Sequence, residues 1–181
     1  AKAKEKAGST TNYSATIAIP AGVTLDVHGI GDDGNPASLT IPDGMSVTFF
    51  GLSGGETPTL SLTKNFDLAG SHAYVRFQNL KLKENGASYF VNQSASATVG
   101  DFALTDCEMA NIKNAFFRLQ GSNGITINNL TLTNCLFHDM CAGYSFIHVD
   151  AGSGKGVVKN VKMTDCTLYN VAETGKMFIY S

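Results

Sequence analysis

Residues 129–135 read Asn-Leu-Thr-Leu-Thr-Asn-Cys, and this stretch decides the fold because the chain repeats it. The same wording returns in Asp101-Phe-Ala-Leu-Thr-Asp-Cys107 and in Asn160-Val-Lys-Met-Thr-Asp-Cys166. The cysteines lie 28 and then 31 residues apart (107 to 135 and 135 to 166), so the loops vary in length while the strands do not. An internal period of this size predicts one supersecondary unit per copy, stacked on its neighbours.

Apolar side chains alternate with polar or small ones in every copy, which is the pattern of a strand with one buried face. Each copy contains three such strands, and short strands joined by bends predict one coil of a parallel β-helix. Equivalent residues then form ladders, because successive coils lie about 4.8 Å apart. The first strands carry the pairs Leu80/Leu82, Phe102/Leu104, Leu130/Leu132 and Val161/Met163, and the third strands carry Tyr89/Val91, Phe117/Leu119, Ile147/Val149 and Ile179.

Asparagine and aspartate recur at the bends, where they tolerate left-handed backbone and bond their own turns. One expected column contains Asn79, Asp101, Asn129 and Asn160, and another contains Asp106, Asn134 and Asp165.

The cysteines of the repeat are expected to form an inward column of buried free thiols. Stacking brings their Cα atoms within disulfide range, but parallel side chains hold the Cβ atoms too far apart for a bond. Cys141 lies in an inserted loop without a counterpart, and the paired Cys/His spacing of a zinc site is absent from the sequence.

The chain divides into an arm and one β-helix domain. Residues 1–12 are rich in Lys and Ala and predict a linker or disordered arm. Within the domain, 13–181, we expect irregular coils over 13–70 and regular coils over 71–181. In the irregular part, 16–25 and 38–47 both predict strand, Pro-Gly turn, strand, and the acidic loop 31–35 between them reads as a turn, with calcium binding as the alternative.

The last residues, Met177-Phe-Ile-Tyr-Ser181, occupy third-strand positions, so we expect a chain truncated at the C-terminus. Its open edge would be covered by other domains of a longer parent chain or by a second copy.

Composition narrows the classes of partner. A net charge of -2 and a pI near 6.1 provide no basic surface, so nucleic acid is not expected to bind. No apolar run approaches the roughly 20 residues of a membrane span.

The coils resemble the right-handed parallel β-helices of the pectate-lyase-like superfamily. The wording of residues 129–137 is similar to that of uncharacterised secreted bacterial β-helix domains associated with polysaccharide utilisation, a resemblance that covers 74–181 well and 13–70 loosely. It implies an all-β, single-stranded right-handed parallel β-helix of about six coils with three short sheets. It also implies a secreted, periplasmic or cell-surface location and polysaccharide or oligosaccharide partners.

Strict alternation along the third strands points one set of side chains outward. Aromatic rings beside a guanidinium, an imidazole and amides suit a sugar-binding surface, whereas a covering loop would make the same stripe structural. The expected ligand-binding residues are Phe116, Phe146 and Phe178 in one column, Phe90, Arg118, His148 and Tyr180 in the next, and Gln120 and Asp150 beyond them, beside Asn92.

Two functions remain open. The first is a non-catalytic carbohydrate-associated binding or structural module. The alternative is a polysaccharide lyase or glycoside hydrolase acting on pectin-like acidic glycans, with Arg118, His148 and Asp150 as active groups. No cofactor or metal is expected except calcium in the lyase case. Three further histidines, His28, His72 and His138, have no partner that spacing identifies.

Overall fold

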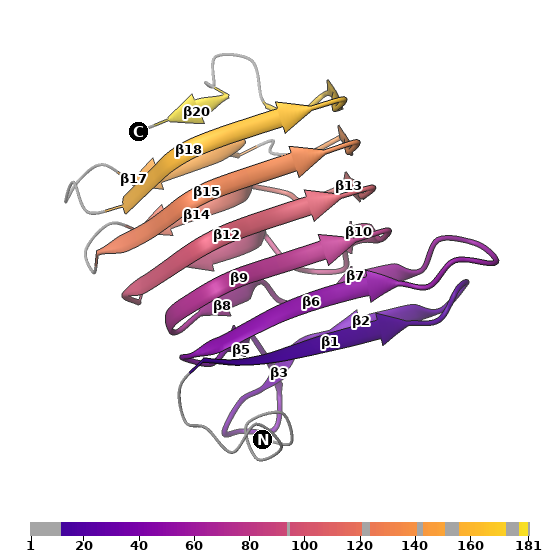
Figure 1. Cartoon of the computed structure of the whole chain (residues 1–181), viewed down its shortest axis with the longest axis horizontal. Coiled ribbons are helices and arrows are strands. Elements are labelled where there is room, and N and C mark those ends of the chain that lie inside the picture. The colour runs from indigo at the N-terminus through magenta and orange to yellow at the C-terminus, as the bar shows by residue number, and fades with distance from the viewer. Residues whose placement is uncertain are drawn as a thin grey trace.

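The computed structural model describes residues 12–93, 95–120, 124–140, 143–150, 156–172 and 178–180. These residues form an all-β parallel solenoid with three six-stranded parallel sheets (Figure 1). The arm expected over 1–12 lies outside them except for Asn12, and the first strand begins at Tyr13.

The strands of each sheet come from successive turns of the solenoid. The first sheet contains β1 (Tyr13–Ile19), β6 (Met45–Gly51), β9 (Gly70–Gln78), β12 (Ala97–Thr105), β15 (Ile125–Thr133) and β18 (Gly156–Thr164). The second contains β2 (Thr24–Val27), β7 (Thr59–Leu62), β10 (Lys81–Glu84), β13 (Glu108–Ala110), β16 (Leu136–His138) and β19 (Thr167–Tyr169). The third contains β5 (Leu39–Ile41), β8 (Phe66–Leu68), β11 (Tyr89–Gln93), β14 (Ala115–Gln120), β17 (Ile147–Asp150) and β20 (Ile179–Tyr180).

Repeat copies pair in register, as the ladder argument requires. Leu130 pairs with Phe102 on one side and with Val161 on the other. The predicted parallel β-helix is therefore confirmed, and six strands per sheet agree with the expected number of coils.

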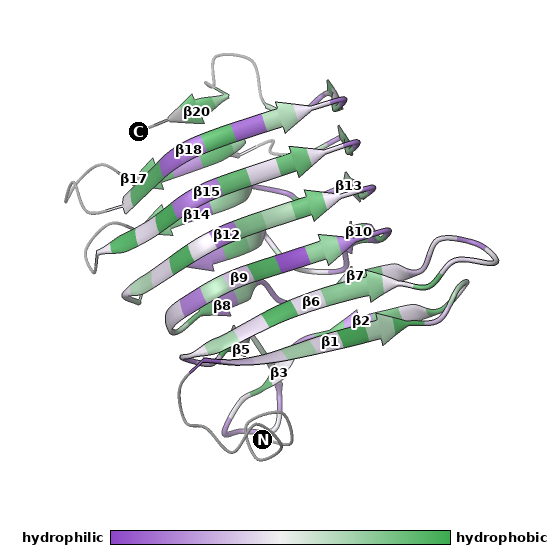
Figure 2. Ribbon diagram, in the orientation of Figure 1, coloured by the Kyte–Doolittle hydropathy of each residue, from purple (hydrophilic) through white to green (hydrophobic). Residues whose placement is uncertain are grey.

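The core lies between the three sheets. Apolar bands alternate with polar ones along β9, β12 and β15 (Figure 2), and the inward side chains of these strands, such as Phe102, Leu104 and Leu130, are fully buried. Burial weakens at the last coil, where Val161 and Ile179 are exposed. Each coil therefore depends on its neighbours to cover its apolar edge.

Two bends of the solenoid are built on left-handed Asn and Asp residues. L-residues other than glycine lose roughly 1–2 kcal/mol in this conformation, which Asn and Asp offset by local hydrogen bonds. Amide-to-carboxylate bonds also join successive coils: Asn134 Nδ2 donates to Asp106 Oδ1 at 2.6 Å, and Asn170 Nδ2 donates to Asp139 Oδ1 at 2.9 Å. The bend after the first sheet uses Asn79, Asp106, Asn134 and Asp165, and the bend after the second uses Asn111, Asp139 and Asn170, all with φ between 50° and 62°.

The structure gives the earliest repeat copy a different register from the one that the sequence predicts. Asn79 belongs to the bend column of Asp106, and Tyr74 is the residue that pairs with Asp101. Leu82 likewise pairs with Met109 on the second sheet, while Val75 pairs with Phe102 on the first. This copy carries Leu80, which is fully buried, where the later copies carry cysteine, so the motif that anchors the alignment is absent from it.

The two early segments each form strand, turn, strand, but they are not equivalent turns of the solenoid. Residues 16–25 lead from the first sheet to the second, whereas 38–47 lead from the third sheet back to the first. Between them β3 (Gly29–Ile30) and β4 (Pro36–Ala37) form a small antiparallel pair. Its loop contains an Asp33 carboxylate that accepts hydrogen bonds from the backbone and side-chain nitrogens of Asn35, which is turn chemistry.

The repeat cysteines are free thiols, as predicted. Cys107 and Cys135 are buried, and Cys166 on the last coil is half-buried. Each thiol donates to the carbonyl oxygen two residues earlier, at 3.2–3.3 Å. The pKa of Cys107 is raised by its hydrogen bond with the Cys135 thiol and by burial. Cys141 lies outside the described residues.

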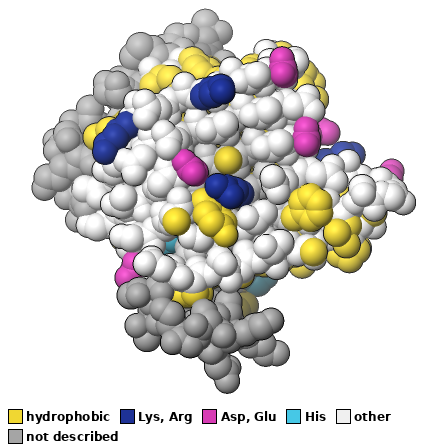
Figure 3. Space-filling view, in the orientation of Figure 1, with side chains coloured by type: hydrophobic (Ala, Val, Ile, Leu, Met, Phe, Trp, Pro, Cys, Tyr) yellow, Lys and Arg dark blue, Asp and Glu magenta, His cyan; other side chains and the backbone are white. Residues whose placement is uncertain are grey.

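The outer face of the first sheet carries mainly uncharged polar groups, and its few charged side chains stand among them (Figure 3). On this face Arg76 lies 3.6 Å from Asp101 and its guanidinium carbon is 4.2 Å from the centre of the Tyr74 ring. The described residues contain no helix of the length and apolarity needed to cross a membrane.

Candidate functional site

The row of polar residues expected on the third sheet exists, with one change of membership. Arg118 on β14 pairs with His148 on β17, and His148 pairs with Tyr180 on β20. On the other side Arg118 pairs with Asn92 rather than with Phe90. Arg118 lies between two buried neighbours, Phe117 and Leu119, so alternation turns its side chain to the outer face.

The expected outward orientation of the phenylalanines is wrong. Phe90, Phe116 and Phe146 are fully buried, and they stack on one another with centroids 5.6 Å and 5.0 Å apart. Phe178 continues this ladder on the last coil, 4.8 Å from Phe146, and is half-buried.

The physical reason is the corner at which the chain enters the third sheet. The backbone nitrogens of Phe116 and Phe117 both donate to the carbonyl oxygen of Phe146, at 3.0 Å and 3.2 Å. Two consecutive side chains therefore turn into the core at this point, and strict alternation begins only after it. The rings of Phe90, Phe116 and Phe146 therefore cannot form a binding surface, because water does not reach them.

Two tyrosines that sequence reasoning missed provide the aromatic groups instead. The Arg118 guanidinium carbon lies 5.5 Å from the centre of the Tyr89 ring and 5.4 Å from that of Tyr144. The two tyrosine rings meet edge to face at 5.7 Å, and Tyr144 meets His148 edge to face at 4.8 Å. We call these four residues, Tyr89, Arg118, Tyr144 and His148, the tyrosine–arginine cluster.

The members of this cluster are all half-buried, so each shows part of its surface to solvent. Burial raises the pKa of Tyr89, and its hydrogen bond with the Tyr144 hydroxyl acts in the same direction. A guanidinium within about 6 Å of an aromatic centre is attracted to the ring face. The two tyrosine rings therefore hold the Arg118 guanidinium in a defined position on the outer face of the third sheet.

The sequence contains a signal for these rings that alternation alone conceals. Tyr89 is the first residue of β11 and directly precedes Phe90, and Tyr144 lies just before β17 and precedes Phe146 by two residues, so each tyrosine lies where the chain enters the third sheet. A residue at that corner points away from the core when the following residues turn into it.

The remaining predicted site residues are placed only by their backbone. Gln120 pairs with Asp150 at the ends of β14 and β17, and Tyr180 ends β20. The side chains of these three residues lie outside the described part of the structure. The catalytic set of Arg118, His148 and Asp150 thus remains a prediction in which the first two members are neighbours in register.

Within the described ranges no group of three or more His, Cys, Asp or Glu side chains is arranged to hold a metal ion. No protein-family model matches the sequence, and neither a curated protein nor a solved structure matches it. The assignment to a parallel β-solenoid therefore rests on the repeat and on the sheet topology.

Proposed function

We propose that this chain is a non-catalytic carbohydrate-binding β-helix module, and that the tyrosine–arginine cluster is its contact surface. The observation that carries the proposal is the position of Arg118 between two tyrosine rings on the outer face of the third sheet. Tyrosine combines an apolar ring face, which packs on the face of a pyranose, with a hydroxyl that bonds to water or to sugar hydroxyls.

Preorganisation supports this function. Sugars lose much of their gross binding energy to desolvation and to the ordering of flexible side chains. Here Tyr89, Arg118 and Tyr144 already contact one another, so less rotamer freedom remains to be lost when a ligand binds. The polar row continues on both sides of Arg118 through Asn92 and His148, along the solenoid axis. An extended oligosaccharide fits such a row better than a single sugar.

The resemblance of the coils to the pectate-lyase-like superfamily extends the proposal to the location of the protein and to the proteins that it acts beside. A module of this kind is exported by a bacterium to the periplasm, the cell surface or the medium, and it acts beside polysaccharide-degrading proteins. Acidic glycans are the favoured ligands, because guanidinium groups pair with carboxylates through strong charge-assisted hydrogen bonds.

A glycan array followed by calorimetry on a positive glycan tests the proposal. Tyr144→Ala and Arg118→Ala are each expected to weaken binding by about 1–3 kcal/mol, as truncation of aromatic and arginine hot spots does. Arg76→Ala is the matched control, since Arg76 also packs on a tyrosine but lies on the first sheet. Equal losses for Arg76→Ala and Arg118→Ala, or binding to no glycan on the array, would refute the proposal.

The neighbouring positions of Arg118 and His148 favour one alternative, cleavage of acidic glycans. In that case His148 would act as the base, Arg118 would bind the carboxylate of the substrate, and Asp150 would assist, with calcium added as the metal of a lyase. Incubation of the protein with pectin-type polymers and calcium separates the two functions. If the wild type yields shortened products and Arg118→Ala does not, the protein is an enzyme. If the polymer is unchanged, the result supports a module that binds without cleavage.

A further inference from the structure

A second polar site lies on the outer face of the second sheet. Lys83, Ala110, His138 and Tyr169 pair in one row across successive coils. The short side chain of Ala110 leaves space between the side chains of Lys83 and His138. A hollow of about 400 Å³ lies there. Its lining residues are Thr59, Lys81, Leu82, Lys83, Glu108, Ala110, Asn111 and His138.

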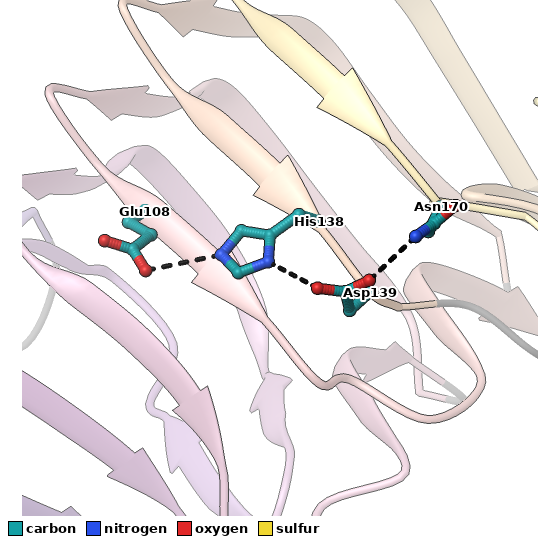
Figure 4. Close-up of polar contacts among 4 residues, drawn as sticks. All are labelled: Glu108, His138, Asp139 and Asn170. Carbon is teal, nitrogen blue, oxygen red and sulfur yellow. Dashed lines mark hydrogen bonds and ion pairs between the residues drawn. The ribbon is translucent and has the colours of Figure 1, made fainter.

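Both ring nitrogens of His138 have a carboxylate partner (Figure 4). Its Nδ1 lies 2.9 Å from Asp139 Oδ2, and its Nε2 lies 3.3 Å from Glu108 Oε1. Asp139 is itself held by Asn170, whose Nδ2 donates to Oδ1 at 2.9 Å. The ring of Tyr169 stacks on the imidazole with centroids 5.1 Å apart. Its position is therefore set before any ligand arrives.

These contacts favour the charged form of His138. Ionised carboxylates only accept hydrogen bonds, so both ring nitrogens satisfy their partners when both carry protons. The hydrogen bond to Asp139 raises the pKa of His138, and the bond to Glu108 raises it further. The ring of His138 forms one wall of the hollow.

The opposite wall carries two lysines. Lys81 and Lys83 are exposed, and within the part of the chain that the structure describes neither forms an ion pair. The carboxylates of Glu108 and Asp139 are instead engaged with His138. On a chain of net charge -2, the hollow thus contains two lysines outside any ion pair, while its nearest carboxylates are paired with His138.

We propose that this hollow binds a small hydroxylated carboxylate of monosaccharide size, such as a sugar acid. Lys81 and Lys83 receive the carboxylate beside the His138 ring, and Thr59, Asn111 and Glu108 bond the hydroxyl groups. The site lies on another sheet than the tyrosine–arginine cluster, so it stands whether or not that cluster binds glycans.

The experiment follows the His138 ring signals by NMR while sodium glucuronate is added, with His28 and His72 as internal references. We expect a saturable shift at His138 and a rise in its measured pKa, because an anion that prefers the imidazolium must raise that pKa by linkage. Glucose has the same ring without the carboxylate and should leave the signals unchanged.

Variants locate the site. Lys81→Gln and Lys83→Gln should each weaken glucuronate binding by about twofold to fivefold, the range for exposed ion pairs. Lys162→Gln is the matched control, since Lys162 is exposed but lies on β18 of the first sheet. Tyr144→Ala should leave the His138 titration unchanged, which separates this site from the tyrosine–arginine cluster.

Three results would overturn the proposal. They are the absence of a shift at His138, an equal loss of affinity in Lys162→Gln, and an equal dissociation constant for inorganic sulfate. An equal dissociation constant for sulfate would show that charge alone determines binding and that the hydroxyl groups of the ligand do not contribute. Circular dichroism of each variant confirms that the solenoid is intact before the titrations are compared.

Discussion

The most direct test of the core is the replacement of Phe116 by alanine. The ring is fully buried, stacks on Phe90 and Phe146, and meets Phe102, Phe117 and Phe137 at steeper angles. A buried phenylalanine removes at least about 150 Å² from water, which at about 25 cal/mol per Å² amounts to roughly 4 kcal/mol. Since a stacked coil cannot collapse onto the cavity, we expect Phe116→Ala to lower the free energy of unfolding by about 3–5 kcal/mol.

Urea unfolding followed by far-ultraviolet circular dichroism measures this loss, since the chain has no tryptophan to report it. Phe178→Ala is the matched control. Phe178 belongs to the same ladder but is half-buried on the last coil, so about 1–2 kcal/mol is expected from its lower burial. If Phe116→Ala costs no more than Phe178→Ala, the ring faces solvent and the corner geometry described above is incorrect.

Three further predictions concern the bends, the histidine and the thiols. Asn134→Ala should lower the free energy of unfolding in urea by about 1–3 kcal/mol, because it removes the hydrogen bond to Asp106 and places alanine in a left-handed conformation. Asn134→Gly should lose only the hydrogen bond, because glycine adopts that conformation without strain. The pKa of His138 is raised above 6.5, so the stability that it contributes is complete below that value and is lost as the pH rises through the folded-state pKa. Wild type should therefore exceed His138→Gln in unfolding free energy by more in acid than in alkali; a constant difference would contradict this. Iodoacetamide with peptide mapping should modify Cys166 before Cys107, because Cys107 is buried; the reverse order would be inconsistent with the core.

The fold was predictable because the sequence repeats at a nearly regular interval. Residues 101, 129 and 160 begin the same seven-residue motif, and all three pair in register in the first sheet. The coil that begins at Gly70 was misaligned because it lacks the cysteine and carries Leu80 in its place. Where the motif is present, the sequence alone sets the register. In the copy that begins at Tyr74, residues 74, 78 and 80 all depart from the motif, and the register must come from hydrogen bonding between coils.

The candidate site was predictable only in part. Arg118 and His148 follow from alternation within a strand, and their adjacency follows from the repeat. The inward turn of Phe116 depends on a corner, where two backbone nitrogens share one carbonyl oxygen and alternation fails. No pattern in the sequence reports such a shared acceptor.

The partners of His138 were hidden for a different reason. Glu108 is 30 residues earlier and lies on the preceding coil, in the row beside that of His138. Such a contact depends on the stacking register and on the small side chain of Ala110. Local spacing around His138 contains neither piece of information.

The asparagine side-chain bonds between coils share one direction. Asn79 donates to Gly51, Asn129 to Asp101, Asn134 to Asp106 and Asn170 to Asp139, so the later coil supplies the donor in each of these bonds. For these bonds, the coil that holds the acceptor is therefore synthesised before the coil that holds the donor. The solenoid is suited to vectorial folding, in which each new coil packs on coils that have already folded. Only the last coil then has an unpaired edge at which mispairing can occur.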